Sequence, residues 1–484
     1  MKARPNVVVF VPDQLRADAV GAFGNDVVST PVIDALAARG ARFSNAYAQH
    51  PVCSPSRASF LTGWYPHVRG HRSLTYLLES GEPNFLKTFK DNGYEVVWAG
   101  ERGDTFAPGA TEESVDAYGF SVPPTGMRWA KDLTYRDEVA ARLFLAGKED
   151  DAESVDFDEA AIRTAERWLA TRPPEPWVLF VPLLAPHVPF RSREPWHSMY
   201  DPAAMPDPAP VPGPQDGPEP RFHQAIRAAY GIEDVPPETW REVTAAYYAM
   251  ISRMDAHLGR VLAAVAAAGA ADDTITAFFA DHGEYLGDYG LVEKWPTSMT
   301  SNILRNPLVL AGPGIPEGVV VDDMVELIDV FPTLLDLAGV PDDTHRHYGR
   351  SLVPRLRGDT GEHRSLAFSE GGFTVEEEPQ FENAPFPYDA KTDLQHAEPS
   401  LVGKAVAVRD RRWSYVHRLY APPELYDREA DPGELVNLAG RPEVADVEGR
   451  LRDAVLRWLL ETADVLPLEP HPRRPVVTAP VPRS

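Results

Sequence analysis

The 484-residue sequence holds a single cysteine, at position 53. Internal disulfides are thereby excluded, and so is any zinc or iron–sulfur site built on several cysteines. Basic charge is also scarce, since 47 Lys and Arg stand against 72 Asp and Glu, for a formal net charge of −25. A nucleic-acid partner needs a basic face for its phosphates, so this balance argues against one.

Long apolar runs are missing as well. The early stretch VVVFV is cut short by Pro12 and Asp13, which makes it too short for the core of a secretory signal. The alanine-rich stretch VLAAVAAAGAA at 261–271 is too short to span a bilayer. We therefore expect no membrane partner and a cytoplasmic location.

What the sequence does contain is an alternation of apolar strands and helices. Strands are expected within 6–14, 176–187, 273–282 and 306–314, and helices within 31–40, 160–172 and 241–270; residues 84–100 read as a helix, a glycine turn and a strand. This alternation predicts an α/β fold whose large, mainly parallel sheet is covered by helices on both faces.

The chain divides into unequal parts. We expect a main domain at 1–372, an irregular polar connector at 373–400, a smaller C-terminal α+β subdomain at 401–466 and an extended tail at 467–484. The proline-dense stretch 201–220 is either a plain surface loop or a rim or lid over a site, and proline alone does not distinguish the two.

Polar side chains follow three of the expected strands. One strand delivers Asp13 and Gln14, a second delivers Asp281 and His282, and a third delivers His187. Each alone has an ordinary explanation as a turn residue, a helix cap or a structural histidine. Ligands of open α/β sheets bind beyond the carboxyl ends of the strands, so together these groups indicate a divalent-metal site.

The stretch CSPSRASFLT at 53–62 resembles a helix start, which places Cys53 at the N-terminal end. Free backbone N–H groups and the helix dipole favour negative charge there, and Arg57 lies on the same face four residues later. The alternative is a small buried hydrophobic residue beside an arginine. A thiol phosphatase loop is a third interpretation, but it needs a longer segment between Cys and Arg.

Cys53, Pro55 and Arg57, followed by Leu61-Thr62-Gly63, resemble the signature of the type I sulfatases, which belong to the alkaline-phosphatase-like superfamily. The resemblance extends over nearly the whole chain. It includes NVVVFVPDQLRADAVGAFGN, PHVPF, YYAMISRMDAHLGRVL, ADHGEYLGDYGLVEKW, VELIDVFPTLLDLAGVP and, near the C-terminus, ELYDREADPGELVNLA. It implies the alkaline-phosphatase-like fold and makes 1–372 the catalytic domain.

The resemblance also implies a chemistry. In this family the motif cysteine is oxidised by a separate formylglycine-generating enzyme to an aldehyde, whose hydrate attacks the sulfur of a sulfate ester and then releases sulfate as the aldehyde re-forms. By matching position, one divalent ion, Ca²⁺ by family default or Mn²⁺, would be held by Asp13, Gln14, Asp281 and His282. The catalytic residues would be Cys53, Arg57, His187 and Lys294.

Two departures from the family pattern qualify this picture. Many members carry a second Asp where Gln14 stands, and the glutamine is typical of phosphonate monoester and phosphodiester hydrolases. The usual lysine and histidine after the strand ending at Gly100 are absent, and Glu101, Arg102 and Asp104 occupy that loop. Arg102 would supply the missing charge and Asp104 a base, while Glu101 either points away or meets a cationic part of the substrate.

We therefore predict a hydrolase of a small sulfate ester, able to form an oligomer. One alternative is a phosphonate monoester or phosphodiester hydrolase on the same scaffold, favoured by Gln14. The other is an inactive sulfatase-like binding protein, favoured by the missing lysine and histidine. The retained Cys53, the metal set, His187 and Lys294 argue against it.

Overall fold

The computed structural model describes residues 4–101, 103–125, 129–149 and 154–468. Arg102 and most of the tail expected at 467–484, from residue 469 on, lie outside the described residues. No described helix combines the length and the apolarity needed to cross a bilayer.

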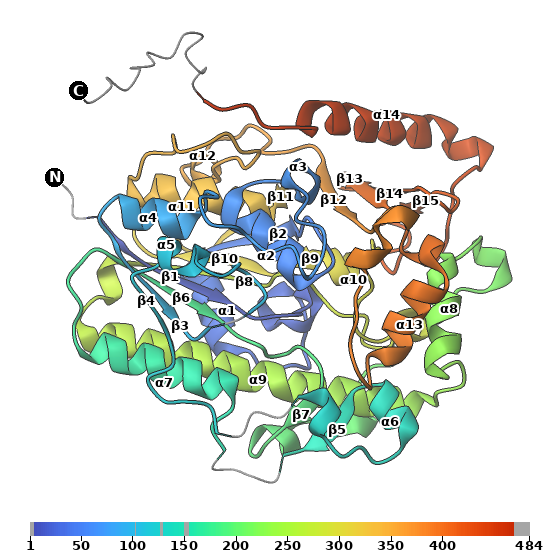
Figure 1. The fold of residues 1–484 in the computed structure, drawn as a ribbon, viewed down its shortest axis with the longest axis horizontal. Helices are drawn as coiled ribbons and strands as arrows, with labels where there is room; N and C mark the ends of the chain where they lie inside the picture. Colours follow the sequence, from blue (N-terminus) through green and yellow to red (C-terminus); the bar gives the residue numbers. More distant parts are fainter. Residues whose placement is uncertain (1–3, 102, 126–128, 150–153, 469–484) are drawn as a thin grey trace, which may run out of the picture.

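A nine-stranded sheet forms the centre of the molecule (Figure 1). Its strands follow the order β11-β2-β10-β8-β1-β6-β3-β4, with β9 paired to β2. Their bounds are β1 Asn6–Val11, β2 Gly40–Tyr47, β3 Glu95–Ala99, β4 Ala117–Gly119, β6 Trp177–Pro182, β8 Thr274–Phe279, β9 Arg305–Asn306, β10 Leu308–Ala311 and β11 Val319–Glu326. All neighbours are parallel except β9 and β10, which run antiparallel to their partners.

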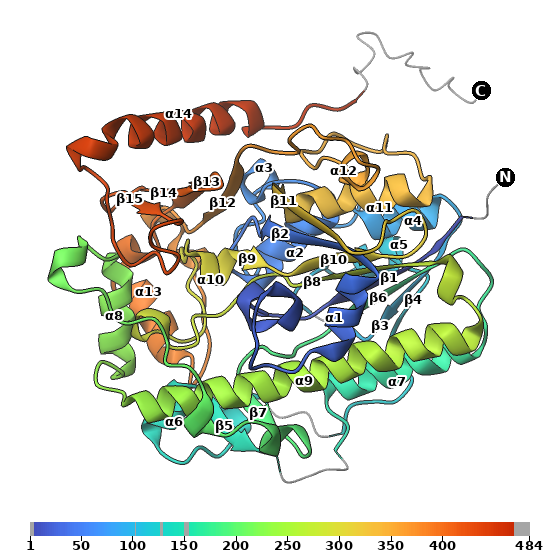
Figure 2. The same ribbon diagram turned by 180° about the vertical axis from the view of Figure 1, so that it is seen from behind.

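The three middle strands β8, β1 and β6 have no exposed residue. Strands buried on both faces read as continuous apolar runs, which is why the sequence predicts them well. Helices α1 (Pro31–Ala38), α7 (Phe157–Ala170) and the 32-residue α9 (Pro237–Ala268) form one covering layer. Helices α2 (Cys53–Thr62), α4 (Phe85–Asp91) and α11 (Val330–Ala338) pack together in the other, as Figures 1 and 2 show. The predicted fold class is confirmed.

A second, four-stranded antiparallel sheet lies toward the C-terminus. It consists of β12 (Ala367–Gly371), β13 (Ala405–Arg409), β14 (Trp413–Arg418) and β15 (Glu424–Asp427), with α14 (Ala445–Thr462) packed across it. The segment 373–400 between its first two strands contains α13 (Asp389–Ala397), a helix that the sequence reasoning did not anticipate. The domain bounds given above stay a prediction.

The remaining elements are short. A two-stranded parallel sheet joins β5 (Leu145–Lys148) to β7 (Phe190–Ser192). Shorter helices are α3 (Pro66–Arg69), α5 (Ala110–Ser114), α6 (Glu138–Arg142), α8 (Arg221–Tyr230), α10 (Ser301–Leu304) and α12 (Val353–Leu356). The proline-dense stretch 201–220 lies against the loop 287–290, where the Ala209 N–H donates to the Asp288 carboxylate and the Ala209 carbonyl accepts from the Tyr289 N–H.

Candidate active site

Three adjacent strands deliver polar side chains to one edge of the main sheet. β1 lies between β8 and β6, with Phe10 opposite Phe278 and Val11 opposite Pro182. The residues that follow these parallel strands therefore emerge side by side. Asp13 and Gln14 follow β1, Asp281 and His282 follow β8, and His187 comes five residues after β6.

Cys53 is the first residue of α2 and is buried. Its Sγ lies 3.1 Å from Nε2 of His282 and 3.6 Å from Oδ1 of Asp13. The His282 ring donates through Nδ1 to the carbonyl of Gly283 at 2.9 Å, which leaves the Nε2 lone pair facing Cys53. The cysteine thus meets the ends of both β1 and β8.

Helix α2 is unusual because all ten of its residues are buried although several are polar. Arg57 is fully enclosed, with Nη2 at 2.8 Å from Oδ2 of Asp281 and 3.3 Å from Oδ2 of Asp13. The Ser56 hydroxyl donates to the backbone carbonyl of Asp281 at 2.6 Å. A guanidinium is tolerated in an interior only when carboxylates pair with it, so α2 and the two strand ends depend on each other.

Burial raises the pKa of the Cys53 thiol well above its ordinary value, and the negative charge of Asp13 adds to the effect. A thiol phosphatase needs the opposite, a thiolate stabilised at low pKa. In this environment the cysteine side chain itself is a protonated and poor nucleophile.

Gln14 and Lys294 form the other side of the site. The Gln14 backbone N–H donates to Oδ1 of Asp281 at 3.1 Å, while its side-chain oxygen accepts from Nζ of Lys294 at 2.7 Å and its amide nitrogen donates to Glu284. Gln14 has a φ of 67°, a strained value for a non-glycine residue that is common at functional sites. Burial raises the pKa of Glu284 to about 7.

His187 touches the same lysine. Its Nδ1 donates to the carbonyl of Val188 at 2.7 Å, so its Nε2 accepts from Nζ of Lys294 at 2.8 Å. Burial, followed by the positive charge of Lys294, lowers the pKa of His187 to about 4. The imidazole is therefore neutral at physiological pH, with its proton on Nδ1 and the lone pair of Nε2 facing Lys294.

Sequence reasoning missed the groups that hold Lys294. Glu293 lies 2.8 Å from Lys294 and 2.9 Å from Lys391, and Lys391 also pairs with Glu382 at 2.9 Å. Burial alone would raise the pKa of Glu293, but the positive charges of the two lysines keep this pKa far below its ordinary range. Glu293 could have been found from the sequence, because it directly precedes Lys294. Lys391 lies in α13, and no motif in the sequence marks it.

Four potential metal donors converge. One donor atom from each of Asp13, Cys53, Asp281 and His282 lies within 4.8 Å of all the others, and all four residues are buried. Two carboxylates and an imidazole suit a divalent cation of the calcium or manganese type. The Gln14 oxygen points to Lys294 in this arrangement, so three of the four predicted ligands already face one centre.

The loop after Gly100 contributes Asp104. Its Oδ2 lies 3.6 Å from Nε of Arg57, which gives this arginine a third carboxylate neighbour. Glu101 is exposed, and Arg102 lies outside the described residues. Both stay predictions as substrate-binding residues.

The comparisons with known proteins agree with this geometry. The Sulfatase family model matches residues 5–340. The chain is 28% identical to a choline-sulfatase of Rhizobium meliloti over 495 residues, covering 98% of this chain and 91% of the relative. It is 29% identical to the multifunctional alkaline phosphatase superfamily protein PehA of Trinickia caryophylli over 525 residues, covering 95% and 96%.

Among solved structures, a phosphonate monoester hydrolase of Agrobacterium radiobacter superposes with a TM-score of 0.74 at 27% identity, covering 95% of this chain and 96% of that one. The fold and the family match extend over the segments that carry Cys53, Asp13 and Asp281. This chain belongs to the sulfatase family of hydrolases.

Proposed function

We propose that the chain hydrolyses a sulfate ester through a nucleophile derived from Cys53, assisted by one divalent metal ion. The observation that carries this proposal is the position of Cys53, at the start of α2 and within 3.1 Å of His282 and 3.6 Å of Asp13. A nucleophile at this point faces both the donor cluster and the buried cation Arg57.

The residues fit a divalent ion. Asp13, Asp281 and His282 present oxygen and nitrogen donors from two strand ends, and rotation of the Gln14 amide would add a fourth. When bound, the ion would acidify the nucleophile and polarise the ester oxygens. Ca²⁺ is the first expectation and Mn²⁺ the second, because an imidazole is among the ligands.

Cys53 fits a formylglycine precursor, because its buried, protonated thiol is unsuited to attack by itself. The hydrated aldehyde would supply one hydroxyl as nucleophile and a second through which sulfate is released.

The other residues have roles that follow from their contacts. Arg57 offsets the charge of Asp13 and Asp281 behind the nucleophile. Lys294 would present a positive charge to the ester oxygens, and the acceptor Nε2 of His187 would hold the Lys294 ammonium in place.

The direct test is the mass of the Cys53 peptide, measured on protein from its native host. We expect the mass of the aldehyde or its hydrate in place of the thiol. If the native protein is active while its Cys53 peptide carries only the unmodified thiol, this mechanism is wrong.

A second candidate, a phosphonate monoester or phosphodiester hydrolase, is favoured by Gln14 and by the likeness to the phosphonate monoester hydrolase structure. Turnover of 4-nitrophenyl sulfate, bis(4-nitrophenyl) phosphate and 4-nitrophenyl phenylphosphonate by one preparation would decide between the two. A kcat/KM for sulfate at or above the other two supports the first candidate.

A further inference from the structure

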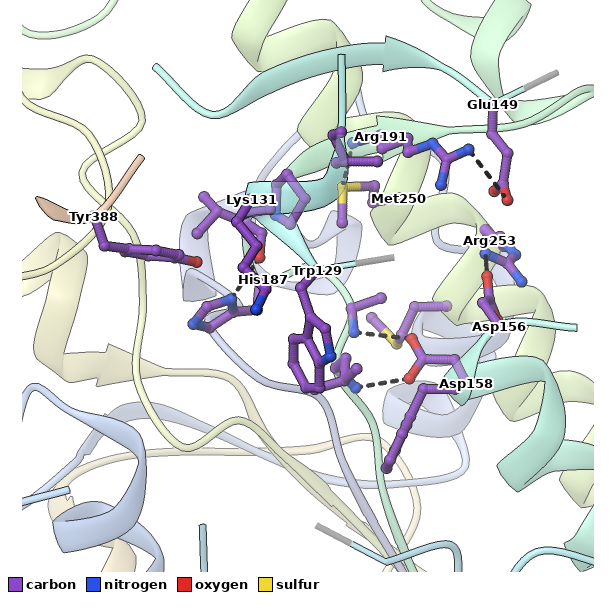
Figure 3. Close-up of a pocket in the computed structure, with 18 of the residues that line it drawn as sticks. Trp129, Lys131, Glu149, Asp156, Asp158, His187, Arg191, Met250, Arg253 and Tyr388 are labelled. Carbon is purple, nitrogen blue, oxygen red and sulfur yellow. Dashed lines mark hydrogen bonds and ion pairs between the residues drawn. The ribbon is translucent and has the colours of Figure 1, made fainter. Parts of the chain in front are cut away.

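A cavity of about 540 Å³ opens beside His187 (Figure 3). Much of its wall is apolar or aromatic, including Trp129, Leu133, Met250 and Phe386. Small-molecule sites typically have volumes of roughly 300–1,000 Å³, so a cavity of this size and lining can enclose a ligand of about 20 non-hydrogen atoms. His187 lines this cavity and also contacts Lys294 of the Cys53 site, so the cavity lies next to that site.

The carboxylates on the far wall already accept hydrogen bonds from other groups of the protein. Asp158 accepts the backbone N–H groups of Leu184 and Ala185 at 2.7 and 2.8 Å, which fixes the turn leading to His187. The two oxygens of Asp156 accept from the backbone of Glu159 and from Arg253.

Glu149, the third carboxylate, is satisfied in the same way. Its Oε2 accepts two hydrogen bonds from Arg193 at 2.9 and 3.1 Å, and its Oε1 accepts from the Ser154 hydroxyl at 2.7 Å. Each of the three carboxylates on this wall therefore has hydrogen-bond partners, and Glu149 and Asp156 also pair with arginines. Asp158 has no cation partner among the described residues, but both of its oxygens accept from backbone N–H groups.

Two cations that line the cavity have fewer charge partners. The guanidinium of Arg191 has a single ion pair among the described residues, at 3.6 Å to Glu149, which Arg193 already neutralises. The ammonium of Lys131, which also lines the cavity (Figure 3), has no ion pair with any described residue. The cavity thus offers positive charge next to an apolar surface.

We propose that this cavity binds the alcohol half of the substrate, and that the alcohol is a hydrophobic, ring-containing molecule with a second anionic group directed at Arg191 and Lys131. The inference rests on the proposed function for the position of the reacting sulfate. Arg191 follows His187 by four residues, so the Cα atoms of these two residues lie no more than roughly 14 Å apart. A rigid two-ring alcohol has the length needed to extend from His187 toward Arg191.

The experiment measures binding of three product-like alcohols to the full chain by calorimetry: 4-phenylphenol, 4′-hydroxybiphenyl-4-carboxylate and the matching trimethylammonium biphenylol. Carboxylate-to-arginine contacts in a shielded site are strong, so we expect the carboxylate to bind about tenfold more tightly than the neutral alcohol and the cation more weakly than both. Arg191→Gln and Lys131→Gln should each reduce the advantage of the carboxylate and leave the neutral alcohol unaffected. Arg39→Gln, an exposed arginine away from the cavity, is the matched control.

Equal affinity for all three alcohols, tighter binding of the cation, or an advantage of the carboxylate that survives the Arg191→Gln/Lys131→Gln double variant would overturn the proposal. Turnover of 4-nitrophenyl sulfate by native-host protein is measured in parallel. Because binding of the alcohols does not require conversion of Cys53, inactivity toward this ester would contradict the proposed function while the binding series still decides the inference.

Discussion

The Cys53 site, which is the buried end, and the cavity that opens beside His187, which is the open end, are built in opposite ways. At the buried end, Asp13, Arg57, Asp281 and His282 have no exposed surface, and each side chain is held by a neighbour from another strand or helix. At the open end, Trp129 is 57% exposed, and Lys131 is also exposed. The buried end fixes the reacting atoms, whereas the open end is free to vary with the alcohol. Changes at the first should therefore abolish chemistry, and changes at the second should alter preference.

The strongest test of this contrast removes a carboxylate from the buried end. Asp281→Ala takes away a donor of the cluster and a partner of Arg57, so we expect loss of the metal and a fall in kcat of at least about 10³-fold. Metal analysis and turnover of 4-nitrophenyl sulfate are the measurements. Trp129→Ala is the control and should keep both metal and kcat. A fully active Asp281→Ala protein, or full activity after exhaustive chelation, would exclude the metal from the mechanism.

Substitution of Lys391 tests whether residues of the segment 373–400 contribute to the buried end. Lys391→Met leaves Glu293 with Lys294 as its one lysine partner, so Lys294 is drawn from Gln14 and His187 toward Glu293. We expect kcat to fall about 10–100-fold, because small misplacements of catalytic groups are costly. The Lys391→Met/Glu293→Gln double variant should recover part of this loss, which a purely structural role would not produce. Lys87→Met, on the far surface of α4, serves as control and should behave as wild type.

His187 lies between the two ends and links stability to pH. Its pKa is about 4 in the folded chain against an ordinary 6.5, so the unfolded state binds more protons between these values. Its contribution to stability is complete above pH 6.5 and is lost as the pH falls toward 4. His187→Gln should flatten the acid side of the stability profile by at most about 1.4 kcal/mol per pH unit. The free energy of unfolding is measured with urea at pH 4.5, 5.5, 6.5 and 7.5. Equal slopes of this free energy against pH for wild type and variant would contradict the prediction.

At the open end the expected effect is smaller and specific to the substrate. Trp129→Ala should raise KM for a biphenyl sulfate about fivefold while leaving kcat nearly unchanged, since it removes packing area and no catalytic contact. The KM for methyl sulfate should stay the same. An equal change in KM for both esters would mean that Trp129 does not line the path of the alcohol.

Glu101 gives the smallest expected effect. Its side chain is exposed, and water and salt screen such a charge, so Glu101→Gln should change the kcat/KM ratio between cationic and neutral sulfate esters by less than about twofold. A larger change would place Glu101 against a cationic substrate and would bring the loop after Gly100 into the open end.

The same contrast explains what the sequence could predict. β1, β6 and β8 are continuous apolar runs ending in polar residues, so the fold class and the residues Asp13, His187 and Asp281 could be found from short windows. The cavity wall, by contrast, comes from five separated parts of the chain: 129–133, Glu149 with 156–158, 184–191, 250–257 and 384–388. No local pattern marks residues that meet only through tertiary packing, and Lys391 is an example.

The strands β2 and β11 of the main sheet were missed for a related reason. They lie toward one edge of the sheet and mix buried with partly exposed residues. Neither a strict alternation nor a continuous apolar run is present in GARFSNAY, so periodicity gives no clear signal there.

The complete burial of α2 would also limit the time available for the proposed conversion of Cys53. An enzyme that recognises Cys53, Pro55 and Arg57 as a peptide would have to reach them before the helix is enclosed. That enclosure includes Asp281, which pairs with Arg57, and α11, whose last residue, Ala338, follows far behind Cys53 in the order of synthesis. At about 5–20 residues per second, a ribosome covers the interval in roughly 14–57 s. Under the proposal, conversion of Cys53 would compete with folding, and chains that fold first would keep the thiol for the lifetime of the native state.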